Sequence, residues 1–120
     1  MDSYTINLSG DVIDPLALQD ALSDLAMKSS GLKGETSLTR KDHIYDESSF
    51  HFDAQGYELR GLLQYLLGVL DRLKDLGVTG IEVNALMERS GQINGELHAD
   101  EIIALSKLGA VFTWSVLFEV

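Results

Sequence analysis

The chain has 120 residues, of which 45% are apolar, and nineteen acidic side chains against nine basic ones give it a net charge of −10. The acidic excess argues against a nucleic acid as a direct ligand, because phosphate binding needs a basic surface, and it allows a basic protein as a partner. The absence of cysteine excludes disulfides, thiol catalysis and cysteine metal sites. No signal sequence is visible, and no apolar stretch reaches the roughly 20 residues that cross a bilayer, so we expect a cytoplasmic protein without membrane contact.

The amino-terminal part predicts a strand followed by a helix. Residues Tyr4–Leu8 alternate apolar with polar side chains, which is the pattern of a strand with one buried face. Asp14-Pro15 predicts a helix start, since aspartate can cap free amides and proline tolerates the first position of a helix. We expect this helix to end by a glycine cap at Ser29-Ser30-Gly31. Its apolar side comprises Leu18, Ala21, Leu22, Leu25 and Ala26.

The middle of the chain predicts a turn, a strand and the longest helix. Leu32–Asp46 indicates a turn with short extended pieces, and Ser49–Asp53 alternates like a strand that places Phe50 and Phe52 on one face. Gly56–Gly77 predicts a helix with a broad leucine stripe. Two glycines of this helix project away from the stripe. They indicate either a tolerant solvent-facing side or the close approach of another surface.

The carboxy-terminal part predicts a strand over Val78–Glu88, a hairpin or bulged connection over Arg89–Leu97, a helix over Asp100–Leu108 and a last strand over Ala110–Val120. We expect the side of this helix that faces the core to consist of Ile102, Ile103, Leu105 and Leu108. The last strand places on one face Phe112, Trp114, Val116 and Phe118. This order of elements predicts a single α+β domain, residues 1–120, with a mostly antiparallel sheet and two or three helices packed on one face.

Motifs for catalysis, metals and cofactors are missing from the sequence. The histidines His43, His51 and His98 lie in separate segments, without the close spacing of zinc ligands. No phosphate-binding glycine loop, calcium loop or nucleophile motif occurs. We therefore expect no catalytic residue, no metal and no cofactor. An enzyme would need a pocket that brings a histidine and carboxylates together.

An acidic block from Asp42 to Glu58 mixes carboxylates with tyrosines. The block is either a solvated loop with a core strand, or a surface on which acids attract a cationic protein and tyrosines supply contact area. On the second interpretation the partner-binding residues are Asp42, Tyr45, Asp46, Glu47, Asp53, Tyr57 and Glu58. Asp20 and Asp24 lie one turn apart, off the apolar side of the first helix, and form a second candidate patch.

Several short motifs together resemble the bacterial domain-of-unknown-function family 4279. They are Ser9-Gly10-Asp11 with Asp14-Pro15, then Leu32-Lys33-Gly34-Glu35, then Ser48–Phe52, and finally Ala104-Leu105-Ser106-Lys107-Leu108-Gly109. One departure is that the family often carries a tryptophan where this chain has Phe50 and Phe52. The resemblance implies a small α+β domain without known catalysis. It also implies that members of the family are encoded beside secreted-toxin systems, in which small acidic proteins serve as immunity proteins.

The sequence thus leads to the hypothesis of an immunity protein. It would bind and neutralise a cognate basic, nuclease-like toxin domain of a bacterial contact-dependent or polymorphic toxin system, as a monomer or weak homodimer. The alternative is a non-catalytic structural or regulatory interaction domain, for instance a homodimer formed through the terminal strand. An exposed row with Phe112 or Trp114 would favour this alternative.

Overall fold

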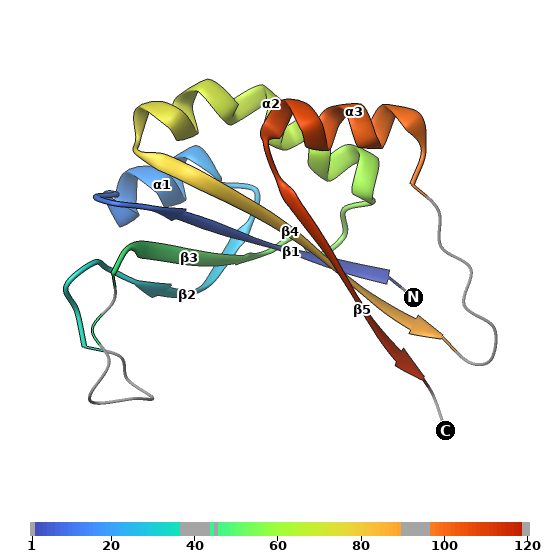
Figure 1. The fold of residues 1–120 in the computed structure, drawn as a ribbon, viewed down its shortest axis with the longest axis horizontal. Coiled ribbons are helices and arrows are strands. Elements are labelled where there is room, and N and C mark those ends of the chain that lie inside the picture. Colours follow the sequence, from blue (N-terminus) through green and yellow to red (C-terminus); the bar gives the residue numbers. More distant parts are fainter. Residues whose placement is uncertain (1, 37–43, 45, 90–96, 119–120) are drawn as a thin grey trace.

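The computed structural model describes residues 2–36, 44, 46–89 and 97–118, and the remaining residues lie outside this description. Five strands form one twisted sheet in the order β2-β3-β1-β4-β5 (Figure 1). The strands are β1 (Asp2–Gly10), β2 (Ala26–Gly31), β3 (Ser48–Asp53), β4 (Val78–Arg89) and β5 (Val111–Phe118). The helices are α1 (Pro15–Ala21), α2 (Leu59–Asp75) and α3 (Ala99–Leu108).

The helices form a single layer on one face of the sheet (Figure 1). In this layer α2 packs against α1 and α3, and it also contacts β4. Neighbouring strands are antiparallel except β4 and β5, which run parallel and are connected through α3. The predicted α+β class with a mostly antiparallel sheet is confirmed. Within the described ranges, no helix is both long and apolar enough to span a membrane.

The core lies between the helix layer and the covered face of the sheet. On the three central strands buried side chains alternate with more polar ones: the buried set is Tyr4, Ile6, Leu8, Phe50, Phe52, Ile81, Val83 and Ala85. The leucines of α2 that close the core from above are Leu59, Leu62, Leu63, Leu66 and Leu73. Because each element buries one apolar side, the period of its sequence pattern matches its structure. The four predicted strands and the long helix are confirmed, although the helix spans Leu59–Asp75 and the last strand begins at Val111.

The first helix is shorter than the sequence pattern predicts. Asp14 does cap it, accepting a hydrogen bond from the Leu16 amide at 3.1 Å, but α1 ends at Ala21. The residues expected to complete the helix form β2, in which Gly31 pairs with Ser49 of β3 instead of capping a helix. Cross-strand pairing outweighs helix propensity here, because serine and glycine are weak helix formers. Of the predicted apolar side, Ala26 is exposed, whereas the buried residues are Leu18, Ala21, Leu22 and Leu25.

The inward side of α3 also differs from the prediction. Ile102 and Ile103 are 53% and 55% exposed, and the buried side is formed by Glu101, Ala104, Leu105 and Leu108. Glu101 turns inward because its carboxylate caps the helix, accepting a hydrogen bond from the His98 amide at 2.9 Å. The side that faces α2 therefore starts at Glu101 and repeats with helical spacing, which leaves the two isoleucines outside. The predicted connection over residues 89–97 lies mostly outside the described residues.

The exposed glycines of α2 give a stability prediction. A Cβ atom added at Gly68 would meet no atom within 4 Å, and one added at Gly61 would meet only Tyr57, at 3.9 Å. The interpretation as a tolerant solvent-facing side therefore holds for both. We expect Gly68→Ala to raise the free energy of unfolding by about 1 kcal/mol, because alanine loses less backbone entropy in a helix. Urea denaturation followed by circular dichroism measures this, and an unchanged or lower midpoint would contradict it.

Candidate functional site

The face of the sheet opposite the helices is uncovered and mostly polar. Along each strand, the side chains that alternate with the core residues point to this face. The strand register aligns five of them in one row across the whole sheet, in the order Ser29, His51, Asn7, Glu82 and Val111. A neighbouring row contains Asn84 and Thr113, and the Thr113 hydroxyl donates a hydrogen bond to the Asn84 side-chain oxygen. Long-range strand pairing thus gathers polar groups that are distant in the sequence.

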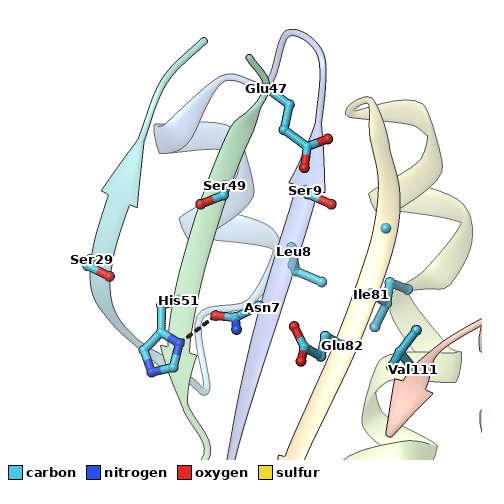
Figure 2. Close-up of a pocket in the computed structure, with 11 residues that line it drawn as sticks. Asn7, Leu8, Ser9, Ser29, Glu47, Ser49, His51, Ile81, Glu82 and Val111 are labelled. Atoms are coloured by element: carbon cyan, nitrogen blue, oxygen red, sulfur yellow. Dashed lines mark hydrogen bonds between the residues drawn. The ribbon is translucent and has the colours of Figure 1, made fainter. Parts of the chain in front are cut away.

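A hollow of about 660 Å³ opens on the uncovered face around the first row (Figure 2). We call it the acidic hollow, and its polar lining residues are Asn7, Ser9, Ser29, Glu47, Ser49, His51 and Glu82. Figure 2 shows the Glu82 carboxylate directed toward Asn7, and Glu47 beside the ends of β3 and β1. A cationic side chain that entered the hollow would find one carboxylate from β4 and one from the start of β3.

A second hollow of similar volume adjoins the acidic hollow and shares His51 with it. Its lining includes Lys28 and Asp53, whose side chains form an ion pair at 3.9 Å, together with Tyr57. The Tyr57 ring packs against Tyr65 of α2, with the ring centroids 5.8 Å apart. Burial raises the pKa of Tyr65 above its ordinary value. The second hollow therefore contains an internally neutralised carboxylate and a packed aromatic ring.

His51 occupies the centre of the uncovered face, between the two hollows. Its Nδ1 lies 2.5 Å from Oδ1 of Asn7, shown as a dashed line in Figure 2. Because an amide oxygen can only accept, Nδ1 carries the proton and Nε2 is an acceptor in the neutral ring. Among the described residues no hydroxyl group hydrogen-bonds this histidine. The acidic hollow does bring His51 together with Glu47 and Glu82, which is the combination of a histidine and carboxylates that an enzyme would need. The groups that line the acidic hollow offer hydrogen-bond acceptors and negative charge.

Among the described residues, the lining of the acidic hollow contains no lysine or arginine. Neither Glu47 nor Glu82 makes an ion pair with a described residue. The ion pairs outside the two hollows join Lys33 to Asp11, Arg60 to Asp100 at 2.7 Å, and Arg72 to Asp20 at 2.7 Å. These pairs use basic side chains in loops and between helices. With respect to the described residues, the electrostatic field at the hollow is therefore that of two carboxylates without an ion-pair partner, within a strongly acidic protein.

The structure brings together only part of the acidic block. Glu47 lines the acidic hollow, while Asp53 and Tyr57 line the second hollow. Asp46 precedes β3 and Glu58 precedes α2, and both are exposed outside the hollows. Asp42 and Tyr45 lie outside the described residues.

The second predicted patch lies on the other side of the molecule. Asp20 belongs to α1, which lies in the helix layer and not on the uncovered face (Figure 1), and Asp24 follows that helix in the sequence. Both are exposed, as the helical register predicts, but Asp20 is already paired with Arg72. The two predicted patches therefore do not form one surface.

Sequence reasoning missed Asn7, His51 and Glu82 as parts of one site. Each occupies an outward position in a correctly predicted strand, so the alternation itself indicated that these side chains avoid the core. The missing information was the strand order, which places β1 between β3 and β4.

Among the described residues, no three histidine, aspartate or glutamate side chains are grouped as metal ligands would be. The comparisons with known proteins add no relative: no protein-family model, no curated protein and no solved structure matches this chain.

Proposed function

We propose that this domain is a non-catalytic binding protein that captures a basic protein through the uncovered face of its sheet. The observation that carries the proposal is the acidic hollow: its described lining has two carboxylates that make no ion pair with a described residue, and it has no lysine or arginine. The ligand chemistry that suits such a site is a guanidinium or ammonium group, because these groups donate hydrogen bonds and carry the opposite charge. An arginine or lysine side chain of a protein partner supplies both.

The biological role that we propose is that of an immunity protein acting in the cytoplasm against a cognate toxin domain with a basic, nuclease-like surface. Acidic side chains would take the positions that nucleic-acid phosphates occupy on the toxin, so that the substrate groove is closed. The net charge of −10 supports fast association, since opposite fields steer two proteins toward each other. Neutral groups of the hollow, such as Ser9 and Ser49, would complete the hydrogen bonds.

The direct test of this role is protection of cells. The polypeptide encoded next to this chain is expressed with and without it, and growth is recorded. We expect the neighbouring polypeptide to stop growth alone and this chain to restore it, with a stable complex of the two purified proteins. Growth arrest that this chain does not relieve would overturn the immunity role, and so would a neighbour that is harmless.

The binding surface has its own charge-matched test. We expect the double variant Glu47→Gln with Glu82→Gln to bind an oligoarginine peptide several-fold more weakly, because both carboxylates of the hollow are removed. The control is Asp71→Asn with Asp75→Asn, which changes the net charge equally on exposed positions of α2. Titration followed by amide chemical shifts gives the affinity and the location together.

In the unaltered protein the peptide should shift the amides of Asn7, His51 and Glu82 first. Equal weakening by the two double variants would mean that only overall charge matters, and the hollow would lose its assigned role. Because the peptide experiment does not involve a toxin, it can succeed even where the protection of cells fails.

A further inference from the structure

The two edges of the sheet differ in their protection against pairing with another chain. The β2 edge carries Lys28 and a register shift between Met27 and Ser29, and both features oppose the addition of a further strand. The β5 edge has neither. Its sequence, VFTWSVLF, contains no charged residue, no proline and no glycine, and no register shift interrupts its pairing with β4. In a chain with this much charge, eight uncharged residues at an open edge are an exception that calls for a partner.

The side chains of β5 leave apolar surface at this edge. Trp114 is 40% exposed, and its ring meets Phe112 edge-to-face, with the centroids 5.6 Å apart and the planes at 87°. Both rings lie on the face of the sheet that the helices cover, since Phe112 pairs with the buried Val83 and Trp114 with the buried Ala85. Phe112 is therefore packed against the core, while Trp114 extends toward solvent.

We propose that β5 pairs with β5 of a second copy of this chain, antiparallel and around a two-fold axis at Trp114. A two-fold axis requires an antiparallel pair in which every contact from residue i to residue j is repeated from j to i, so that only the residue on the axis meets its own equivalent. With Trp114 on the axis, Phe112 lies opposite Val116 of the second copy, and Thr113 lies opposite its Ser115. Aromatic with β-branched pairs and pairs of hydroxyl residues are both favourable across antiparallel strands. The two sheets become one continuous sheet of ten strands.

The uncharged sequence of β5 and its self-complementary register favour a second copy over another kind of occupant. Two copies with a net charge of −10 repel each other over most of their surface, and the uncharged β5 is a strip along which they can approach. A basic peptide would gain no carboxylate from the residues of β5, although it would find free carboxylates in the acidic hollow. The symmetric register also places Phe112 opposite Val116, and Thr113 opposite Ser115, in both directions. This inference is independent of the proposed function, which concerns the uncovered face.

The test uses Trp114 as an internal probe, because it is the only tryptophan in the chain. Sedimentation equilibrium over a dilution series should show a species of twice the 13.2 kDa of one chain that dissociates on dilution. Over the same series the Trp114 emission maximum should move to longer wavelength as the ring becomes exposed. A mass of 13.2 kDa with constant emission at all concentrations would overturn the proposal, and these measurements need no variant.

A charge-swap pair tests the register. Thr113→Lys with Ser115→Lys places two like charges opposite each other on both sides of the axis, and we expect it to remain monomeric. Thr113→Lys with Ser115→Glu places opposite charges there instead, so we expect the dimer to be retained. Both variants lose the hydrogen bond from Thr113 to Asn84, which makes them matched. Dimers of equal strength in the two variants, or none in either when circular dichroism shows that both are folded, would refute the register.

Discussion

Replacing Leu18 by alanine is expected to lower the free energy of unfolding by about 3 kcal/mol. Leu18 is fully buried, with 0% exposure, in the layer between α1 and the sheet. The loss combines the transfer free energy of the removed carbon atoms with the cavity that they leave, and the short α1 has few other buried residues with which to close it. A loss of this size is a large part of the total stability of a small domain.

Leu16→Ala is the matched control for this prediction. It makes the same change two residues earlier in the same helix, at a position that is 78% exposed, and we expect an effect within about 0.5 kcal/mol. Urea unfolding of the two variants and the unaltered protein gives the comparison, provided that the slopes agree. Similar losses for the two variants would mean that α1 does not pack as the structure places it.

The elements that the sequence predicts well are those whose pattern is local. Alternation over Tyr4–Leu8 and Ser49–Asp53, and the leucine stripe of the long helix, each report one apolar side of one element, and the structure buries those sides. The error over Ala26–Gly31 has a non-local cause. That segment becomes a strand because β3 lies beside it, and β3 begins only at Ser48, beyond the reach of a local helix pattern.

The register of α3 shows a different limit. A glutamate on the inner side contradicts the usual rule that apolar residues point inward, so counting isoleucines placed Ile102 and Ile103 in the core. The cap formed by Glu101 with His98 decides the register, and that interaction becomes visible only once the helix start is known.

The candidate site was predictable in kind but not in composition. Net charge indicated a cationic partner, and Glu47 of the acidic block does line the acidic hollow. Glu82 and Asn7 come from strands remote in sequence, and no charge count along the chain could join them to Glu47 before the strand order was known. The uncharged β5 was read correctly as a strand, yet its place at the sheet edge also depends on that order.

The closest approach of two backbone segments leads to the second large effect. Gly10 at the end of β1 lies against Gly77, so that a Cβ atom at Gly10 would overlap the Gly77 carbonyl oxygen and lie 2.8 Å from Ile13 Cδ1. Gly77 adopts a φ of 100°, and a Cβ there would lie 2.7 Å from the Val12 carbonyl oxygen. Backbone atoms cannot move aside as a flexible side chain can, so this close contact between the two segments requires glycine at both positions.

Three alanine variants separate the effect of steric overlap from the effect of a strained, positive φ. Gly10→Ala introduces overlap alone, and we expect a loss of about 3 kcal/mol in the free energy of unfolding. Gly56→Ala introduces strain alone, since φ is 88° and no atom lies within 4 Å of the added Cβ, and we expect a loss of about 1 kcal/mol. Gly77→Ala combines both and should be the least stable of the three. Urea midpoints give the order, and a Gly10→Ala protein as stable as Gly56→Ala would show that the end of β1 and the residue before β4 do not approach this closely.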